Sequence, residues 1–580
     1  MQLKRLAGLL VTAAILLTAC SKKGPSYTQY IPKNASYVVA LDVKEMISKL
    51  EKDSLTVENM MEVLKDSSNP TQYSQAMEIW GKFKDAGLDF ENKVLIAVPV
   101  IDINAGGIDV QVIAGLKDAK KLEDFISKMP NAPKVQKDND LSYAIQDDMI
   151  IGWNKDAVMI LGGHKMHKMN YNAGEGNEPS AVAPALPGGG SQLEKLKKYF
   201  TLKKEESIVA VDQFNKLMGK KADIAVFTNS AGIAGQASPA MAMMPKVKDL
   251  LEDIYSASTV NFEEGKVVIE GDTYVGKKLG EILKKYTGPV VDMDLVDPYP
   301  SNNVDGVTAF SFDPQLIPAL LKETGFDALV DMGMAQQGIT TAEIIKAFKG
   351  DFAVMFSDFE MKQEEKENWE GEKYMSHEPS AKLLVAVRIG DKAAFDKLVD
   401  LAVKQGMFVK NGNRLMLANG GVPEAEEKAI IGIENGLLVF STDETIYKGY
   451  VAKSSKIGMN DEVHGKIKGA SLAMFFDVEK ILNAIPETVL DSSAVHEKNV
   501  LAKAKPLFKK LILSSENFDG TKIHGVGEMQ LAAGKNSLPQ LVRFLMYTAE
   551  EMKAKDVEDK MKWDVSTDST AAPANDMPVH

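Results

Sequence analysis

Short apolar runs alternate with amphipathic segments along the chain, and this pattern predicts both strands and helices. Val94–Ile103 and Ile108–Leu116 are two apolar runs, and they flank the sequence NAGG, which is typical of a hairpin turn. Lys120–Lys128 and Lys392–Lys404 instead have the apolar spacing of helices that bury one face. Mostly antiparallel strands with interspersed helices predict an α+β fold, with helices packed on a face of each sheet.

Further turn signals divide the chain into hairpins. Asn435-Gly436 lies between two apolar runs, and both residues tolerate the positive φ that a tight hairpin needs. Glu263–Gly265 and Asp519-Gly520 predict two more hairpins. The strands expected on either side of Lys362–Ser380 are separated by that long polar segment, which we interpret as an insertion.

The chain matches itself in five segments that recur in the same order, which predicts a duplication. The pairs are Val38–Leu50 with Val307–Leu321, Val112–Met129 with Val385–Ala402, Met149–Gly163 with Ala429–Asp443, Ile208–Met218 with Leu472–Leu482, and Ser258–Leu283 with Ser514–Leu541. We therefore expect two homologous α+β halves, residues 27–287 and 299–553, each with a mostly antiparallel sheet. Residues 288–298 are the expected linker.

Acidic residues stand where predicted strands meet predicted helices. Four acidic side chains could suggest a metal site, but Asp is also a preferred N-cap, because it accepts hydrogen bonds from the free N–H groups of a helix start. Capping explains every position without requiring the residues to meet in space. We therefore predict helix N-caps at Asp42, Asp118, Asp212, Asp313, Asp391 and Asp477.

Two segments have no partner in the self-comparison. Ala173–Ser191 is rich in Gly, Pro, Ala and Ser, which is typical of a mobile loop or linker. Residues 554–580 are polar and are expected to form a disordered tail.

The first residues have the pattern of an export signal. Lys4 and Arg5 precede an uncharged run from Leu6 to Ala19, which is too short to span a bilayer comfortably. The run ends in the sequence LTAC, which resembles the lipobox of bacterial lipoproteins. We predict a signal peptide over residues 1–19, cleavage between Ala19 and Cys20, and lipid on the Cys20 thiol.

Composition limits the partners that the exported chain could have. Cys20 is the single cysteine, so the monomer has no internal disulfide. Removing Lys4 and Arg5 with the signal from the 68 Lys and Arg leaves 66 against 81 Asp and Glu, a formal net charge of −15. This charge argues against nucleic acid and against adhesion to anionic lipid through a basic surface. The expected membrane contact is through the N-terminal acyl chains.

No residue pattern in the sequence defines an active site. His164 and His167 have a helical spacing that could suit a metal, but no third ligand is near and two lysines flank them, so a surface loop is favoured. The other histidines are scattered singly at positions 377, 464, 496, 524 and 580. We predict no catalytic residue, no metal and no cofactor, and the chain is more typical of a non-enzyme.

Ala231–Val247 is a methionine-rich segment interrupted by Gly and Pro. It brings Met241, Met243 and Met244 close together in sequence, and their adaptable side chains could line a pocket for an apolar ligand. The alternative, which we favour, is that this segment packs onto the sheet at the start of a helix.

The lipobox is followed by SYTQYIPKNA, which leads into VVALDV. This arrangement resembles the large Bacteroidetes lipoproteins that share a domain of unknown function (the DUF4836 type). The resemblance implies a Gram-negative cell envelope and supplies no site residues. In that phylum, lipoproteins displayed at the surface often carry acidic residues after the lipidated cysteine. The residues after Cys20 are SKKG, which favours an outer-membrane anchor that faces the periplasm.

Three functions are consistent with the sequence. The first is a non-enzymatic binding or scaffold lipoprotein that works on an unknown envelope protein or polymer, because duplicated sheets offer a cleft or an extended surface. The second is a carrier of a lipid or another apolar ligand. The third is a hydrolase whose site the sequence does not reveal.

Overall fold

The computed structural model describes residues 24–568, apart from 66–76, 78–80, 100, 103–106, 130–131, 147–148, 166–189, 231–244, 368, 370, 418–428 and 491–493. Cys20 and Ala19, the residues predicted for lipidation and cleavage, therefore lie outside the described residues, as do Met241, Met243 and Met244.

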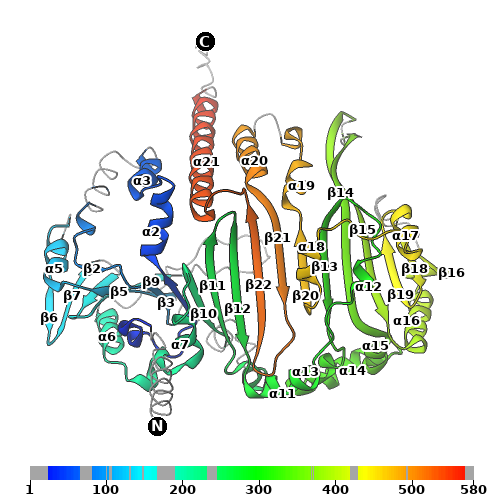
Figure 1. Ribbon diagram of the computed structural model, residues 1–580, viewed down its shortest axis with the longest axis horizontal. Helices are drawn as coiled ribbons and strands as arrows, with labels where there is room; N and C mark the ends of the chain where they lie inside the picture. Colours follow the sequence, from blue (N-terminus) through cyan, green and yellow to red (C-terminus); the bar gives the residue numbers. More distant parts are fainter. Residues whose placement is uncertain are drawn as a thin grey trace, which may run out of the picture.

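The described strands form one continuous antiparallel sheet of 22 strands, which runs across the whole molecule (Figure 1). Read inward from one edge, the order is β6 (Gln136–Asp138), β7 (Leu141–Gln146), β8 (Met149–Trp153), β9 (Ala157–Lys165), β5 (Gly107–Leu116), β3 (Val94–Val98), β1 (Tyr37–Leu41), β10 (Ile224–Asn229), β11 (Tyr255–Glu263) and β12 (Lys266–Tyr274). The short strands β2 (Leu88–Asp89) and β4 (Ile101–Asp102) also pair with β5.

Read inward from the other edge, the order is β16 (Phe408–Asn411), β17 (Arg414–Leu417), β18 (Ile430–Glu434), β19 (Leu437–Ser441), β15 (Lys373–Ile389), β14 (Phe348–Glu367), β13 (Val304–Ser311), β20 (Leu472–Phe476), β21 (Phe508–Ser515) and β22 (Lys522–Leu531). The two series meet where β12 pairs with β22. Each series comes from its own part of the sequence. When the strands of each series are counted along the chain, the two series have the same strand order.

Helices join the strands and cover both faces of the sheet. They are α2 (Val43–Lys52), α3 (Val57–Lys65), α5 (Ala119–Ser127), α6 (Gly190–Phe200), α7 (Asp212–Met218), α10 (Pro245–Leu251), α11 (Lys277–Lys285), α12 (Met293–Val296), α13 (Leu316–Thr324), α14 (Asp327–Gln336), α15 (Thr341–Ala347), α16 (Lys392–Lys404), α17 (Glu444–Val451), α18 (Asp461–Ile467), α19 (Val478–Asn483), α20 (Val495–Leu507) and α21 (Ser537–Asp568), with short 3-10 turns η1 (Ser26–Tyr30), η2 (Lys204–Glu206), η3 (Ile208–Ala210) and η4 (Glu487–Val489). The predicted α+β class and its antiparallel sheet are thus confirmed.

Helices on both faces follow from the alternation of side chains along β11. Ala257 is buried in the core cluster beneath α7, whereas Phe262 packs against the cluster of α2 and α21. Residues five apart in a strand point to opposite faces, so these helices lie on opposite sides of the sheet. The expectation of helices on a single face was therefore too simple.

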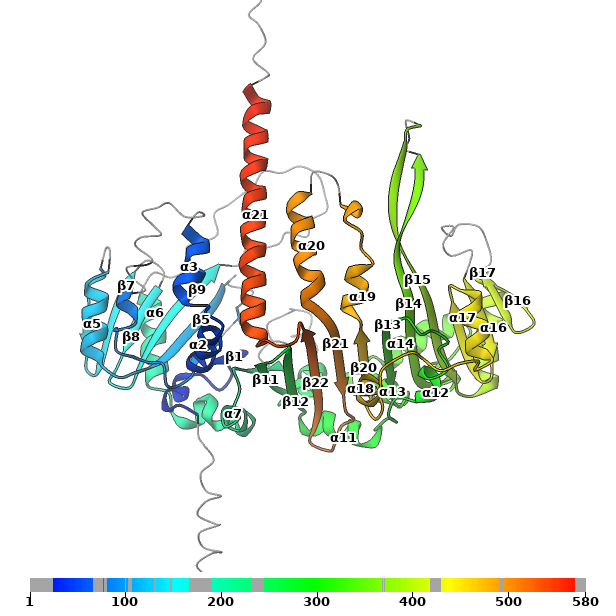
Figure 2. The same ribbon diagram turned by 45° about the horizontal axis from the view of Figure 1, so that its top comes forward.

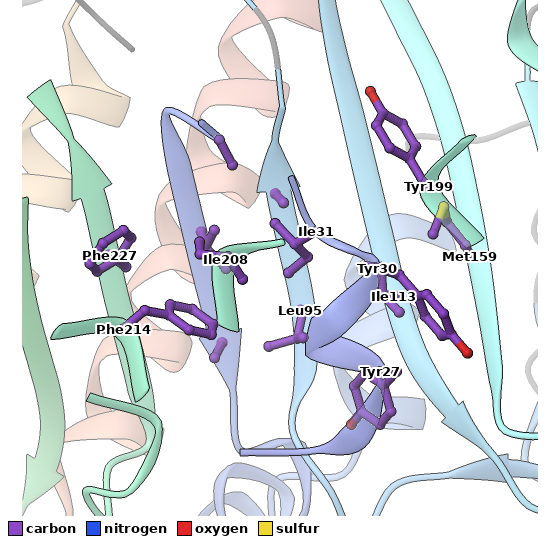
Figure 3. Packing of buried hydrophobic residues seen from close by; sticks show 14 of the residues in the cluster. Tyr27, Tyr30, Ile31, Leu95, Ile113, Met159, Tyr199, Ile208, Phe214 and Phe227 are labelled. Carbon is purple, nitrogen blue, oxygen red and sulfur yellow. The ribbon is translucent and has the colours of Figure 1, made fainter. Parts of the chain in front are cut away.

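The two ends of the sheet have separate cores. In the first, Phe214 of α7 meets Phe227 of β10 edge to face, with ring centroids 5.5 Å apart. Figure 3 shows this pair, together with Ile31 and Ile208, whose side chains lie over Leu95 of the sheet. The second core gathers buried residues of β13, β14, β15, β19 and β20 beneath α12, α17 and α18.

The predicted hairpins and most predicted caps are confirmed. Asn435 and Gly436 both have positive φ in the β18–β19 turn. The side chains of Asp42, Asp118, Asp391 and Asp477 accept hydrogen bonds from the first N–H groups of α2, α5, α16 and α19.

Two predicted caps were wrong. Asp212 is the first residue of α7 rather than its cap, because the apolar residues before it form the 3-10 turn η3 instead of a strand. Asp313 accepts a hydrogen bond from the Gln315 N–H at 2.9 Å, in a turn that precedes α13.

The 3-10 turn η3 also contradicts one of the five sequence matches. Ile208–Met218 forms η3 and α7, whereas Leu472–Leu482 forms β20 and α19. In strand order, β20 corresponds instead to β10. Strand β10 lies between β1 and β11, and β20 lies between β13 and β21.

Two predicted boundaries also change. The linker 288–298 contains α12, and its residues Val291, Leu295 and Val296 are buried in the second core. Residues 554–568, expected in a disordered tail, continue helix α21, and 569–580 lie outside the described residues. Of Ala173–Ser191, only the last two residues are described, at the start of α6.

The polar segment Lys362–Ser380 is a continuation of two strands. β14 has 20 residues and β15 has 17, and their pairing extends from Glu360 with Ser380 to Glu367 with Lys373. This two-stranded part rises out of the sheet (Figure 2), and we refer to residues 360–380 as the arm.

Corresponding hairpins have the same register and the same close contact. Gly152 pairs with Met159 in β8–β9, and Gly432 pairs with Val439 in β18–β19. A Cβ on Gly152 would overlap the fully buried side chain of Leu196 in α6, and one on Gly432 would overlap Tyr447 in α17.

Gly152→Ala should therefore lower the free energy of unfolding by roughly 1–3 kcal/mol, the cost of overpacking a dense core. Denaturant titration of the mature chain measures this change. Gly162→Ala, in the adjacent strand, is the control, because its Cβ would make only an ordinary 3.5 Å contact with Met149. Equal effects of the two substitutions would contradict this account of the close contact.

Candidate functional site

The junction of β12 and β22 carries two buried carboxylates. Asp272 on β12 pairs with His524, and Glu528 on β22 pairs with Val268. Asp272 and Val268 are four residues apart, so both carboxylates project from the same face of the sheet. Their residues are only 4% and 7% exposed, and buried charges require partners.

Asp272 is held by basic groups from both parts of the sheet. Its carboxylate accepts hydrogen bonds from Lys522 Nζ and His524 Nδ1, each at 2.8 Å. Lys220 Nζ and the Tyr274 hydroxyl lie at 3.5 Å. Burial alone would raise the pKa of Asp272, but the hydrogen bonds from Lys522 and His524 and the charge of Lys220 outweigh it, and the pKa falls to about 2.

Glu528 has a similar environment. Lys466 Nζ of α18 lies 3.0 Å from its carboxylate, Lys266 Nζ of β12 lies at 3.5 Å, and Gln530 Nε2 donates at 2.6 Å. Burial would raise the pKa of Glu528, but the hydrogen bonds from Gln530 and Lys466 and the charge of Lys266 lower it below its ordinary value.

Each of the two carboxylates contacts a lysine of the opposite strand. Lys522 of β22 binds Asp272 of β12, and Lys266 of β12 approaches Glu528 of β22. Each carboxylate receives a further lysine from the segment that covers this face, Lys220 after α7 and Lys466 in α18. The arrangement fixes the register of β12 against β22, because a shift of one residue would place the two carboxylates on opposite faces of the sheet, away from each other's lysines.

A second ionic contact joins the two helices that stand above the sheet. His496 Nδ1 of α20 lies 2.7 Å from Glu551 of α21, and its Nε2 lies 3.3 Å from Glu558. The hydrogen bond with Glu551 raises the pKa of His496. Asn499 also donates to Glu551 at 3.2 Å, so the contact favours a fixed position of α20 beside α21.

The described histidines lie on five different elements of the fold. His164 belongs to β9, where it pairs with Ile108, rather than to the expected surface loop. His377 lies on the arm, 2.9 Å from the Gln363 side chain, and His464 contacts Asp297 at 2.8 Å. His167 and His580 lie outside the described residues. Among the described residues, no group of three His, Cys, Asp or Glu side chains could hold a metal ion.

The sequence did not indicate the junction carboxylates. Asp272 and Glu528 occupy matched positions of the last repeated segment, which was the one available signal. Asp272 and Glu528 come near the lysines of the opposite strand only because β12 pairs with β22. Neither of the two matched segments predicts this long-range pairing alone.

An open groove runs between α2–α3 and α21. It encloses about 910 Å³ and mixes polar and apolar lining residues, among them Asn59, Glu62, Arg543, Met546 and Glu550. The groove is large enough for a peptide segment or a small ligand.

Comparison with known proteins gives little further information. No family model matches the chain, and no curated protein matches it. Among solved structures, the chain is similar to one titled "Structure of crystal form I of TP0453", with 7% sequence identity and a TM-score of 0.22 over 43% of this chain and 78% of that chain. A likeness this weak carries no argument. In the described part of the chain, no helix has the length and apolar character needed to cross a bilayer.

The depressed pKa of Asp272 predicts how stability changes with pH. A carboxylate whose pKa is lower in the folded state stabilises that state above its unfolded pKa, and the contribution disappears as the pH falls through the folded value. Asp272→Asn should therefore lower the free energy of unfolding at pH 7, and its difference from the wild type should shrink between about pH 4 and pH 2.

Denaturant titrations across that pH range measure the difference. Glu270→Gln is the matched control, because Glu270 is exposed on the same strand and the same face. A difference for Asp272→Asn that stays constant down to pH 2 would show that the ion pairs do not stabilise the junction.

Proposed function

We propose that this protein is a non-enzymatic binding or scaffold lipoprotein of the cell envelope, anchored through lipid on Cys20. In this proposal it faces the periplasm from the outer membrane and binds an envelope protein or polymer. The observation that carries the proposal is the arm, which projects from a sheet that needs no such extension for its own pairing.

The arm exposes apolar side chains at its tip. Trp369 lies in the turn and is 92% exposed, and Tyr374 and Met375 next to it are about half exposed. Exposed Trp, Tyr and Met side chains are typical of protein-binding surfaces, and Trp and Tyr bury large areas there at low entropic cost. Ion pairs along the arm, such as Lys373 with Glu365 at 2.6 Å, favour a defined two-stranded shape.

The position of the arm supports a partner away from the anchoring membrane. Gly24, four residues after Cys20, lies against Met218 of α7. Helix α7 lies at the lower edge of the molecule in Figures 1 and 2, whereas the arm and the free end of α21 project from the opposite side. Four residues reach at most about 14 Å, so an anchored α7 would stay near the membrane and the arm would point away from it.

We also propose that the two series of strands are homologous halves that arose by duplication. The shared strand order, the shared register of the β8–β9 and β18–β19 hairpins, and the caps Asp118 and Asp391 support this proposal. At the junction, Asp272 and Glu528 each contact a lysine of the opposite strand, which is a further similarity between the two series.

The anchor can be tested with Cys20→Ser in the expressing cell. The variant should fold normally but lose stable membrane attachment, because each buried CH₂ of an acyl chain contributes about 0.8 kcal/mol and the acidic surface offers no second attachment. Fractionation after a salt wash measures the attachment. A variant that still sediments with membranes would contradict the lipid anchor.

The binding function can be tested with a photo-crosslinking amino acid placed at Trp369. Illumination of whole cells should give a defined crosslinked product that mass spectrometry identifies as one envelope component. The same amino acid at Leu329 of α14, a 59% exposed position away from the arm, is the control. A crosslinking pattern at Trp369 that is no different from that at Leu329 would contradict a binding function for the arm.

A further inference from the structure

An apolar cavity of about 290 Å³ lies between α16 and the outer part of the second series of strands. Helix α16 contributes Phe395, Leu398 and Ala402 to its wall, and the sheet contributes Val385, Phe440 and others. All twelve residues that line the cavity are hydrophobic. A cavity of this size is well above the ordinary packing voids of a protein core.

The corresponding place in the first series of strands is filled by the chain's own side chains. Asp118 and Asp391 cap α5 and α16, so Leu122, Phe125 and Met129 correspond to Phe395, Leu398 and Ala402. The larger Met129 therefore stands where α16 has Ala402, and it packs against the cluster beneath α5.

The sheet beneath α5 also carries a larger side chain than the sheet beneath α16. The common register of the hairpins places Trp153 of β8 opposite Val158, as Ile433 of β18 lies opposite Leu438. Trp153 is 2% exposed and packs with Leu122 and Phe125, so it occupies the space between α5 and the sheet. In the second series the smaller Ile433 takes the place of this tryptophan and packs against the cluster beneath α16, and its cross-strand partner Leu438 lines the cavity.

We propose that this cavity binds an unbranched acyl chain. Its lining residues offer no hydrogen-bonding side chain, so only an apolar group can enter without losing hydrogen bonds to water. Its volume is about twice that of the roughly 150 Å³ apolar cavity that admits benzene in an engineered core. A flexible hydrocarbon tail fits such a space while its polar end remains outside.

The anchor proposed on Cys20 begins far from this cavity along the sheet. Gly24 lies beside α7, which contacts β10 and β11, whereas the cavity begins at β15. Seven strand spacings of about 4.8 Å separate β11 from β15, which is more than twice the reach of the four residues from Cys20 to Gly24. In the proposed function the acyl chains on Cys20 are inserted in the membrane, so the ligand that we propose for the cavity is a free fatty acid or the tail of another lipid. The site also differs from the apolar contact predicted at Met241, Met243 and Met244.

Binding can be measured on the mature full-length chain with the fluorescent fatty acid cis-parinaric acid, whose emission rises in an apolar site. We expect saturable binding that dodecanoate displaces. Ala402→Met, which introduces the side chain of the first series, and Leu438→Trp enlarge two lining positions and should weaken binding at least tenfold. Leu329→Trp adds a tryptophan at an exposed position and should bind as the wild type does.

Two further measurements separate the ligand sources and guard against misfolding. A soluble short-chain phosphatidylglycerol, used below its micelle concentration, that displaces the probe as well as dodecanoate does identifies a lipid tail as the ligand, whereas displacement by dodecanoate alone identifies a free fatty acid. A photoreactive fatty acid should label α16 or β15 of the wild type, which needs no variant to fold. Labelling elsewhere, or cavity-filling variants that fold and bind the probe normally, would overturn the proposal.

Discussion

The backbone pairing of β12 with β22 is the interaction on which the rest of the molecule depends. Nine residues of each strand face one another, from Lys266 with Gln530 to Tyr274 with Lys522. Each of these strands would otherwise be a long open edge, with a row of free N–H and C=O groups that could pair with other chains. Their mutual pairing removes both edges at once and turns two ten-strand series into one sheet.

The junction also explains why charges are buried in the middle of the sheet. Removing a carboxylate from water is costly, and a buried ion pair seldom stabilises a fold more than apolar packing would. Asp272 and Glu528, each bound by a lysine of the opposite strand, instead make one register much better than its neighbours. The remaining outer edges are protected differently, because β6 and β16 have only three and four residues and each carries a lysine.

The sequence was informative where structure is decided locally. Asn435-Gly436 and the caps at Asp118 and Asp391 depend on a few adjacent residues, and these were predicted correctly. The apolar run before Asp212 was not, because an apolar run forms a strand only where a neighbouring strand is free to pair with it, and here β1 already pairs with β3 and β10. The arm and the end of α21 were missed because polar composition indicates exposure to solvent, which a projecting ribbon or helix has as much as a loop.

The candidate sites show the same division between local and long-range information. Neither Asp272 nor Glu528 belongs to a motif, and the cavity beneath α16 becomes apparent only when β15, β18 and β19 are placed under that helix. An architecture of two joined series of strands makes such a cavity compatible with a stable fold. The first series retains a filled core around Trp153, and β12–β22 pairing ties the two series into one sheet, so a cavity at the far end has little effect on the junction. Stability and an open apolar space can therefore reside in different parts of one continuous sheet.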